Sequence, residues 1–237
     1  MSNPARNDTL LTPDNHAVLM IDHQYLQLLA LRSHPAEAVI NNSVFLAKAA
    51  KVFGVPTLYT TAFADRQKLF QELQAVHPEQ VPIDRTGLNS WDDPRVLDWV
   101  KKTGKKKLVM AGLWTEVCLS MPVLSALADG YEVYIVTDAS GGGSDEGHER
   151  GVQRMVQAGA RPLSTIAYVR AAARLEPPDG RRDRQALRRT RRRLRPGPAL
   201  GMAAPGPQGR HALIAGTHVA PERQAGAAFP NGGVRTA

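Results

Sequence analysis

The sequence predicts an α/β fold in which helices cover both faces of a mostly parallel sheet. Short, almost wholly apolar segments alternate with amphipathic segments through the first 170 residues. A segment without polar alternation is typical of a strand buried on both faces. The connections between segments are short, and repeated strand–helix alternation of this kind favours βαβ units arranged in three layers, helix–sheet–helix.

Six segments are predicted to be strands. The first covers residues 16–23, is apolar almost throughout, and carries Asp22 near its end. Such an almost uninterrupted apolar run is typical of a strand that is buried on both faces. The segment 81–84 is the shortest of the six. The other predicted strands cover residues 55–61, 108–113, 132–139 and 161–169.

Five segments are predicted to be helices. The clearest covers residues 36–53, where apolar residues recur at close to 3.6 positions. Gly54 follows it, as glycine commonly follows the last turn of a helix. The helix predicted over 92–103 is likewise followed by Gly104. The remaining predicted helices cover residues 67–76, 117–128 and 145–158.

Charge and composition divide the chain at residue 170. Residues 1–170 hold 17 Lys and Arg against 18 Asp and Glu, whereas residues 171–237 hold 13 Arg and 4 acidic residues. Of these last 67 residues, 17 are Gly or Pro and only 9 are Leu, Ile, Val or Phe. So little apolar surface does not offset the entropy lost on ordering. The sequence therefore predicts one domain, 1–170, followed by a disordered basic tail, 171–237, rich in Arg, Ala, Gly and Pro.

The distribution of charged and apolar residues also limits the kinds of partner that are expected. Because the basic excess lies in the tail, it gives no reason to expect a specific nucleic-acid partner for the domain. A salt-sensitive complex lost on deleting residues 175–237 would instead indicate binding by the tail. No run of about 18 apolar residues is present, so no membrane partner is expected. The single cysteine and a beginning unlike a signal peptide predict a cytoplasmic protein.

Three residues at predicted strand ends are candidates for chemistry. Ligands bind beyond the carboxyl ends of parallel strands, where Asp22, Arg85 and Cys118 fall. A thiol at the start of a helix faces the positive end of the dipole, which favours the thiolate, and the free N–H groups of the turn suit an oxyanion. Asp22 could act as a general base. Each also has an ordinary interpretation: a core cysteine, a capping aspartate and a surface arginine.

Several segments together resemble the isochorismatase-like cysteine hydrolases, and within them the YcaC-like branch. They are VLMIDHQ, IDRTGLNSWDD, GLWTEVC, and LADGYEVYIVTDASGG followed by HERGVQRMVQAGA. They occur in the family's order over residues 10–170, and GLWTEVC and VTDASGG are the most specific of them. The resemblance implies a Rossmann-like hydrolase fold and a small-molecule substrate that is hydrolysed at an amide or related C–N bond through a thioester.

The resemblance also implies roles for individual residues. Asp22 would take the thiol proton, and Cys118 would attack the carbonyl carbon. The backbone N–H groups of Trp114 and Cys118 would form the oxyanion hole, with a cis peptide bond at Leu113–Trp114. The lysine of the family's triad aligns with Arg85. Arginine keeps the positive charge but does not readily donate a proton, so electrostatic support is expected from it and proton transfer is not.

Phe63, Trp91 and Trp114 are predicted to form an aromatic wall of the substrate pocket, which would suit a small, flat or apolar substrate. Aromatic residues near strand ends are as often part of the core. Nicotinamidases of the superfamily bind a metal through an Asp-x-His pair after the second strand. The segment 59–65 of this chain has no histidine, so neither a metal nor another cofactor is expected. The resemblance further implies a homo-oligomer.

Two alternatives to a cysteine hydrolase follow from the same residues. Arg85 and the unusual tail are compatible with a non-catalytic family member that serves as an oligomeric scaffold or binds a ligand. An unreactive Cys118 would favour that interpretation. The second alternative is isochorismate-type vinyl-ether hydrolysis, which does not use the cysteine. The presence of both Asp22 and Cys118 makes it less favoured.

Overall fold

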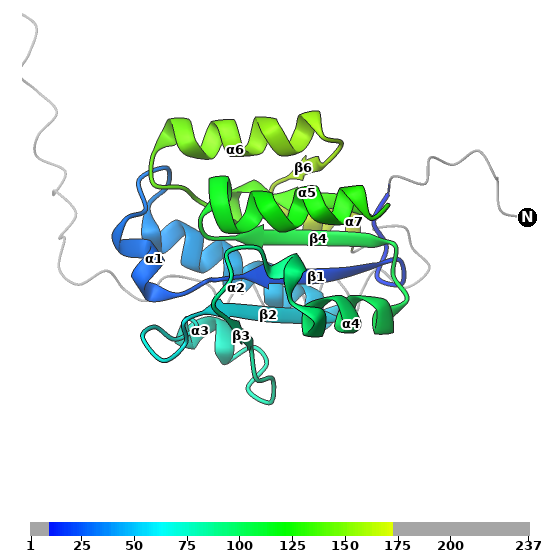
Figure 1. Cartoon of the computed structure of the whole chain (residues 1–237). Coiled ribbons are helices and arrows are strands. Elements are labelled where there is room, and N and C mark those ends of the chain that lie inside the picture. The colour runs from blue at the N-terminus through cyan, green and yellow to red at the C-terminus, as the bar shows by residue number, and fades with distance from the viewer. Residues whose placement is uncertain (1–9, 173–237) are drawn as a thin grey trace, which may run out of the picture. The chain divides into compact units, whose positions relative to one another are not determined.

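One six-stranded sheet forms the centre of the computed structural model, which describes residues 10–172 (Figure 1). All neighbouring strands are parallel, in the order β3-β2-β1-β4-β5-β6. The predicted mostly parallel sheet is confirmed. The strands are β1 (His16–Ile21), β2 (Thr57–Ala62), β3 (Ile83–Arg85), β4 (Lys107–Gly112), β5 (Glu132–Val136) and β6 (Arg161–Leu163).

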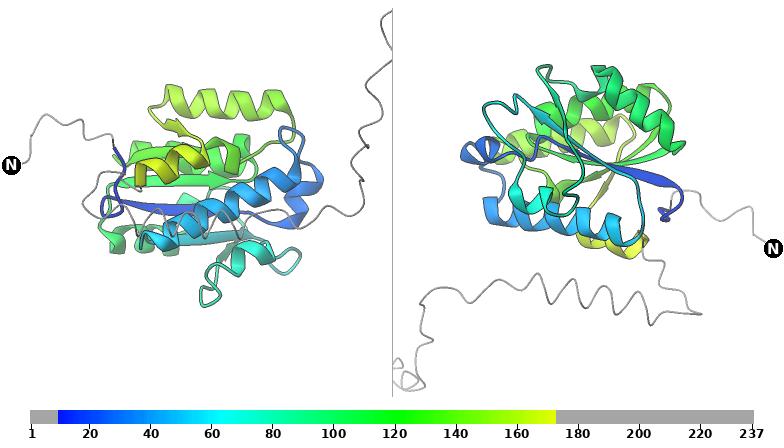
Figure 2. Two further views of the ribbon diagram at one scale, coloured as in Figure 1. Left: turned by 180° about the vertical axis from the view of Figure 1, so that it is seen from behind. Right: turned by 90° about the horizontal axis from the view of Figure 1, so that it is seen from below.

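Helices cover both faces of this sheet, which gives the three layers predicted (Figure 2). One face packs against α2 and α7, and the other packs against α4, α5 and α6. The helices are α1 (Tyr25–Leu29), α2 (Ala36–Val52), α3 (Gln71–Gln74), α4 (Pro94–Thr103), α5 (Ser120–Ala128), α6 (Asp145–Gln157) and α7 (Thr165–Ala172).

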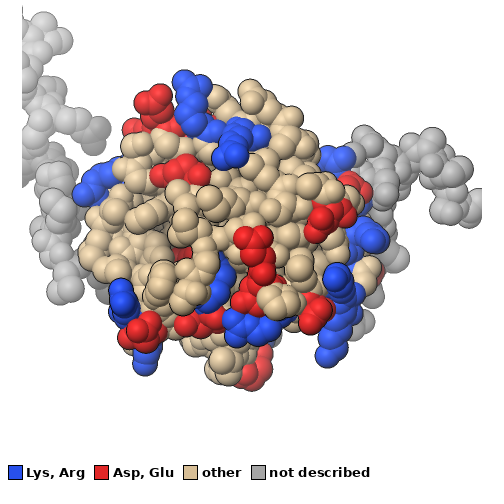
Figure 3. Space-filling view, viewed as in Figure 1, with Lys and Arg blue, Asp and Glu red and all other residues tan. Residues whose placement is uncertain are grey.

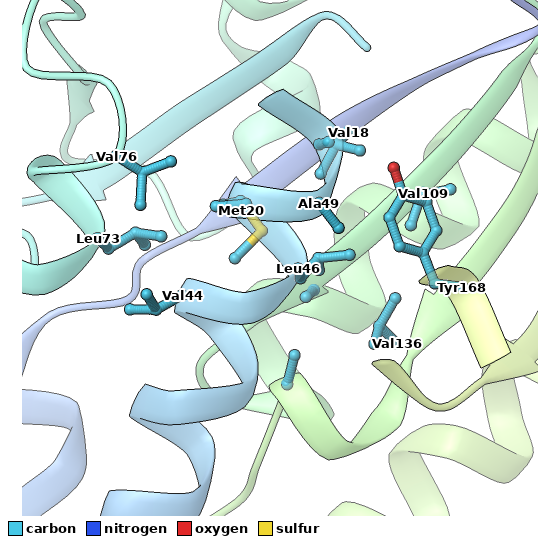
Figure 4. Close-up of a cluster of buried hydrophobic side chains, with 14 of the residues drawn as sticks. Val18, Met20, Val44, Leu46, Ala49, Leu73, Val76, Val109, Val136 and Tyr168 are labelled. Carbon is cyan, nitrogen blue, oxygen red and sulfur yellow. The ribbon is translucent and has the colours of Figure 1, made fainter. Parts of the chain in front are cut away.

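Alternate side chains of β1 enter two separate cores. Val18 and Met20 lie in the core beneath α2, together with Tyr168 from α7 (Figure 4). Leu19 and Ile21 lie in the core beneath α4 and α5. All six residues of β1 are buried. After His16 the strand is wholly apolar, because neither of its faces meets water.

Local sequence sets the ends of α4. The helix follows Asp93, whose carboxylate accepts a hydrogen bond from the backbone N–H of Arg95. Pro94 occupies the first helical position, where its missing N–H costs nothing. Gly104 ends the helix in the left-handed region, at φ +67°, which glycine adopts without strain.

The prediction of a strand over 161–169 is wrong in its second half. Only Arg161–Leu163 is a strand, and Thr165–Ala172 forms α7. Thr165, Tyr168, Val169 and Ala172 are its buried residues, at the spacing of one helical face. A short apolar run does not by itself distinguish a strand from a helix. The helix predicted over 67–76 is also shorter than expected, since α3 covers four residues, and α1 was not predicted.

The helix α7 runs two residues past the predicted end of the domain. The rest of the predicted tail, 173–237, lies outside the described residues. Within the described part of the chain, no helix combines the length and apolarity needed to span a bilayer. Acidic and basic side chains are interspersed over the face seen in Figure 3.

Candidate active site at the carboxyl ends of β1 and β4

The candidate residues meet at the point in the sheet where the order of the strands reverses. The strands β1 and β4 are neighbours, yet β2 and β3 lie on one side of them and β5 and β6 on the other. Beyond the carboxyl ends of such a pair a crevice opens, which is the usual ligand site of doubly wound sheets. Asp22 follows β1, and Cys118 follows β4 by six residues. This edge of the sheet lies beside α1 (Figure 1).

Asp22 is fully buried and accepts hydrogen bonds from three side chains. Its Oδ2 accepts from Nη2 of Arg85 at 2.7 Å, and its Oδ1 accepts from the hydroxyl of Thr60 at 3.3 Å. The thiol of Cys118 also donates to this carboxylate. Asp22 has φ +56°, an uncommon conformation for a residue other than glycine, though aspartate tolerates it better than most. The structure therefore brings all three predicted catalytic residues into one cluster.

Arg85 reaches Asp22 from two strands away. It ends β3 and pairs in register with Ala62 of β2, so its side chain crosses the end of β2. The side chain is 3% exposed, and Nη1 donates to the carbonyl oxygen of Gly87. The ion pair is therefore shielded from water, where the attraction between opposite charges is stronger than at the surface. A guanidinium can make both contacts at once because its donors form a planar fork.

The electrostatics of the cluster favour a protonated thiol at rest. Burial, together with the negative charge of Asp22, raises the pKa of Cys118 to about 11, although Arg85 and a backbone hydrogen bond from Trp114 act in the opposite direction. Burial also raises the pKa of Asp22, against the lowering effect of Arg85. The expectation that the helix dipole favours a thiolate is thus not met. Burial and the adjacent carboxylate both act against the thiolate.

The turn before Cys118 has an unusual backbone. The Leu113–Trp114 peptide bond is cis, as the resemblance implied, and Thr115–Leu119 forms a π-helical turn rather than the start of a regular helix. The backbone hydrogen bond from Trp114 reaches the thiol of Cys118. The indole of Trp114 donates to the carbonyl oxygen of Gln27 at 3.0 Å, which holds this side chain against α1.

The aromatic residues predicted for the pocket differ in placement. Phe63 follows β2, has φ +55° and is 38% exposed, and its N–H donates to the carbonyl of Arg85 at 3.1 Å. Trp91 is only 4% exposed, its indole donates to Asp129 at 2.8 Å, and its ring packs edge-on against Tyr131. Trp91 is therefore a core residue rather than part of a pocket wall, because its polar atom and its ring both have partners inside the fold.

Other strand-end residues have structural roles. Asp138 accepts hydrogen bonds from the backbone N–H and the hydroxyl of Thr165, and so begins α7. Thr61 donates to Asp84 at 2.9 Å. Lys68, between β2 and α3, is exposed and does not join the ion pair with Asp22. The sequence places Thr60 close to a strand end without assigning it a role. Its position at the end of the strand next to Asp22 was the available signal.

Two cavities lie beside β3. One, of about 390 Å³, is lined by Arg85 together with Asp84, Asn89, Arg95 and their neighbours. The other, of about 760 Å³, lies between α3 and β3. Cys118 lines neither of them. Among residues 10–172, no group of three or more His, Cys, Asp or Glu side chains is placed to hold a metal ion.

Comparison with known proteins identifies one family. The isochorismatase domain model matches residues 16–167. The probable hydrolase YcaC of Escherichia coli strain K12 is 40% identical over 157 residues, which cover 65% of this chain and 76% of that protein. Isochorismatase family protein 1B of Dictyostelium discoideum is 26% identical over 164 residues, covering 67% and 79% of the two chains.

Solved structures show the same fold. Escherichia coli YcaC, described as an octameric hydrolase of unknown specificity, superposes with a TM-score of 0.71 at 36% identity, covering 77% of this chain and 89% of that one. Pseudomonas aeruginosa YcaC with hexane-2,5-diol and covalent acrylamide gives a TM-score of 0.68 at 36% identity, covering 71% and 85%. The MAR1 ribonuclease of Caenorhabditis elegans, at 21% identity and a TM-score of 0.68 over 82% and 98% of the chains, shares the fold alone.

Proposed function

This chain belongs to the isochorismatase family of hydrolases, and we propose that it is a cysteine hydrolase that cleaves a small amide or a related C–N bond through a thioester. One observation carries the proposal. The thiol of Cys118 donates to a buried carboxylate, Asp22, which is held in turn by the buried guanidinium of Arg85. A nucleophile, its base and a group that orients the base are the parts required for covalent catalysis.

The first half of the reaction forms the thioester. Cys118 is protonated at rest, so its proton passes to Asp22 as the sulphur attacks the carbonyl carbon of the substrate. The C–S bond forms, and the carbonyl π electrons move to the oxygen, which the backbone N–H groups of Trp114 and Cys118 stabilise. When the tetrahedral intermediate collapses, the C–N bond breaks and Asp22 returns its proton to the leaving nitrogen. The raised pKa of Asp22 suits a residue that accepts and then donates a proton.

The second half of the reaction repeats this sequence with water. Asp22 takes a proton from water, the oxygen of water attacks the thioester carbon, and the same two N–H groups stabilise the oxyanion. The C–S bond breaks, and Asp22 gives its proton to the thiolate of Cys118. Arg85 stays protonated throughout, and its positive charge stabilises the ionised carboxylate before each proton transfer.

The covalent acrylamide in Pseudomonas aeruginosa YcaC supports this assignment. Acrylamide is a small primary amide and an electrophile that thiols attack. Its covalent attachment in that relative is expected of a site with a reactive nucleophile that admits a small amide. By the similarity of the two chains, we propose the same class of ligand here.

A screen of short-chain primary amides for ammonia release tests the proposal. We expect turnover by the wild-type protein, and roughly a thousandfold lower kcat or less in Cys118→Ala with the fold retained. Acid quenching during turnover followed by intact-mass measurement is expected to show an acyl adduct on the wild type that hydroxylamine removes.

Full turnover by Cys118→Ala on any substrate would show that the nucleophile is assigned wrongly. A folded wild-type protein that neither turns over amides nor allows alkylation of Cys118 would favour the alternative, a non-catalytic scaffold or ligand-binding member of the family. Circular dichroism of both proteins is the control for folding.

The chain is also proposed to form a homo-oligomer. The related Escherichia coli YcaC is described as octameric. Large apolar side chains are exposed on α1, where Leu29 is 72% and Leu26 is 52% exposed. Native mass spectrometry of the full chain tests this, and a monomer at micromolar concentration would contradict it.

A further inference from the structure

The turn that carries the proposed oxyanion hole is attached to the segment leading into α6 through the carboxylate of one half-buried residue, Glu116. We infer that Glu116 is a positioning residue, whose carboxylate holds this turn in the shape in which the N–H groups of Trp114 and Cys118 face the same oxygen. This inference rests on the proposed function, and it assigns a role to a residue that touches neither the substrate nor the thiol.

Glu116 lies between the two proposed oxyanion donors and extends toward residues 142–147. Its Oε1 accepts a hydrogen bond from the backbone N–H of Gly143 at 2.9 Å. Its Oε2 is buried and has no hydrogen-bond partner among the described residues. A carboxylate with one unpartnered buried oxygen is costly, so packing alone would be better served by an uncharged side chain. The negative charge does strengthen the hydrogen bond that Glu116 accepts from Gly143, and we therefore look to this bond for the role of the residue.

Two glycines form the slot that receives this carboxylate. A Cβ on Gly142 would lie 2.4 Å from Oε2 of Glu116, and a Cβ on Gly147 would lie 3.0 Å from Oε1. Neither glycine has a positive φ. The backbone conformation does not require glycine at either position, but a side chain at position 142 would displace the carboxylate of Glu116 from its observed place.

Neighbouring contacts attach the same turn to the same segment. The N–H of Thr115 donates to the carbonyl of Gly141 at 2.9 Å, and the Thr115 hydroxyl is hydrogen-bonded to Nδ1 of His148 at 2.9 Å. A Cβ on Gly151 of α6 would lie 2.9 Å from Cα of Glu116. The turn is thus fixed by close packing and by hydrogen bonds at two consecutive residues, and of the bonds described here the one that the Glu116 carboxylate accepts from Gly143 involves a charged group.

The consequence concerns the developing oxyanion rather than the thiol. If Glu116 is removed, the turn can relax toward the empty slot, and its two N–H groups no longer converge as closely. The thiol keeps its neighbours Asp22 and Arg85. We therefore expect binding of a tetrahedral adduct to weaken while the intrinsic reactivity of Cys118 stays the same.

Two probes of the single thiol separate these effects. Isobutyraldehyde adds reversibly to Cys118: the C–S bond forms, the carbonyl π bond breaks onto oxygen, and the thiol proton passes through Asp22 to that oxygen. The oxygen then occupies the oxyanion hole. Chloroacetamide alkylates the sulphur and releases chloride, without a tetrahedral oxyanion. Aldehyde affinity is measured as protection of Cys118 from chloroacetamide, read by intact mass.

In Glu116→Ala we expect aldehyde affinity to fall by about tenfold or more, because a misplaced oxyanion donor loses much of its contribution. Glu116→Gln keeps an oxygen facing Gly143 and is expected to remain within about threefold of the wild type. Gly142→Ala leaves Glu116 in the chain but displaces its carboxylate, so it is expected to resemble Glu116→Ala. The matched control is Glu146→Ala, which removes an exposed carboxylate from the first turn of α6 and is expected to change nothing.

Support requires that the chloroacetamide rate and its pH profile stay within about twofold of the wild type in all folded variants. Unchanged aldehyde affinity in Glu116→Ala or, if that variant does not fold, in Gly142→Ala would overturn the inference. An equal loss of aldehyde affinity and alkylation rate would also overturn it, since it would show general damage to the site. A wild-type protein that is alkylated but not protected by aldehyde would overturn both this inference and the proposed oxyanion hole.

Discussion

Three buried side chains interact at the site: the thiol of Cys118, the carboxylate of Asp22 and the guanidinium of Arg85. A carboxylate at the end of an apolar strand is costly unless it is paired, and Asp22 is paired with Arg85 at 2.7 Å. The thiol of Cys118 supplies a further donor to the same carboxylate while it remains protonated. The arrangement stores the nucleophile as a thiol and places its base within hydrogen-bond reach.

Replacing Asp22 by Asn is expected to shift the alkylation profile of Cys118 to lower pH. The wild-type rate should rise about tenfold per pH unit between pH 7 and 10, because the pKa of the thiol is about 11. Asn removes the negative charge that raises this pKa, while Arg85 continues to lower it. Chloroacetamide labelling followed by intact-mass measurement gives the profile. Because Arg85 loses its carboxylate partner in this variant, thermal unfolding checks that the variant remains folded.

An Asp22→Asn profile that coincides with the wild type, or that lies at higher pH, would show that the two residues are not coupled. Labelling of the wild type only after unfolding would identify Cys118 as an inert core residue instead. Either outcome is unambiguous because the chain has one cysteine.

Among the elements of the fold, the ends of β1 and β4 lie close together, and the residue at their contact, Gly112, has no side chain. Gly112 is the last residue of β4 and pairs in register with Ile21. A Cβ at position 112 would lie 3.0 Å from both the Cβ and the carbonyl oxygen of Ile21, and 3.4 Å from the Cβ of Leu119. A Cβ at this position would therefore require the end of β1 to move by a few tenths of an ångström, whereas its distance from Leu119 is that of an ordinary contact.

Gly112→Ala is expected to lower the free energy of unfolding by about 1–3 kcal/mol, because a rigid strand pair must shift to admit the methyl group. Urea unfolding measures this change. The matched control is Gly87→Ala, where an added Cβ meets nothing within 4 Å, and a change within about 0.5 kcal/mol is expected there. Equal stability of the two variants would contradict the role assigned to Gly112.

For the molecule as a whole, buried neutral histidines tie the sheet to segments distant in the chain. The ring of His16 is hydrogen-bonded to the carbonyl oxygen of Thr12 and to the hydroxyl of Tyr168 on α7. The ring of His23 is hydrogen-bonded to the carbonyl oxygen of Ala139 after β5. Burial lowers the pKa of both histidines to about 4. Both rings are therefore neutral in the folded protein at pH values where the unfolded chain is already protonated.

The free energy of unfolding is expected to fall as the pH is lowered from about 6.5 to about 4. In this range the unfolded chain binds protons that the folded protein does not, so each histidine contributes a slope of up to about 1.4 kcal/mol per pH unit. Above pH 6.5 the contribution is constant. Urea unfolding between pH 7 and 4 gives the slope, and His16→Gln should reduce it by about one proton. An identical slope in this variant would exclude His16 as a source.

Much of this architecture follows from the sequence by itself. Uninterrupted apolar runs and 3.6-residue periodicity are local properties, and they predicted the parallel sheet, its two helical layers and the position of Asp22 and Cys118 beyond strand ends. The resemblance carried by GLWTEVC and VTDASGG predicted the family, which the comparisons confirm, and the cis peptide bond. The helix α7 was not predicted, because a short apolar run fits both a strand and a helix.

Only the tertiary structure decided which side chains share an environment. The reach of Arg85 across β2 to Asp22, the burial of Trp91 against α5, and the slot that receives Glu116 all join residues far apart in the chain. The upward shift in the pKa of Cys118 depends in the same way on burial and on a carboxylate that follows another strand, whereas the sequence made visible only the local start of a helix. Periodicity reports which way a residue faces, whereas charge, burial and reactivity depend on what faces it.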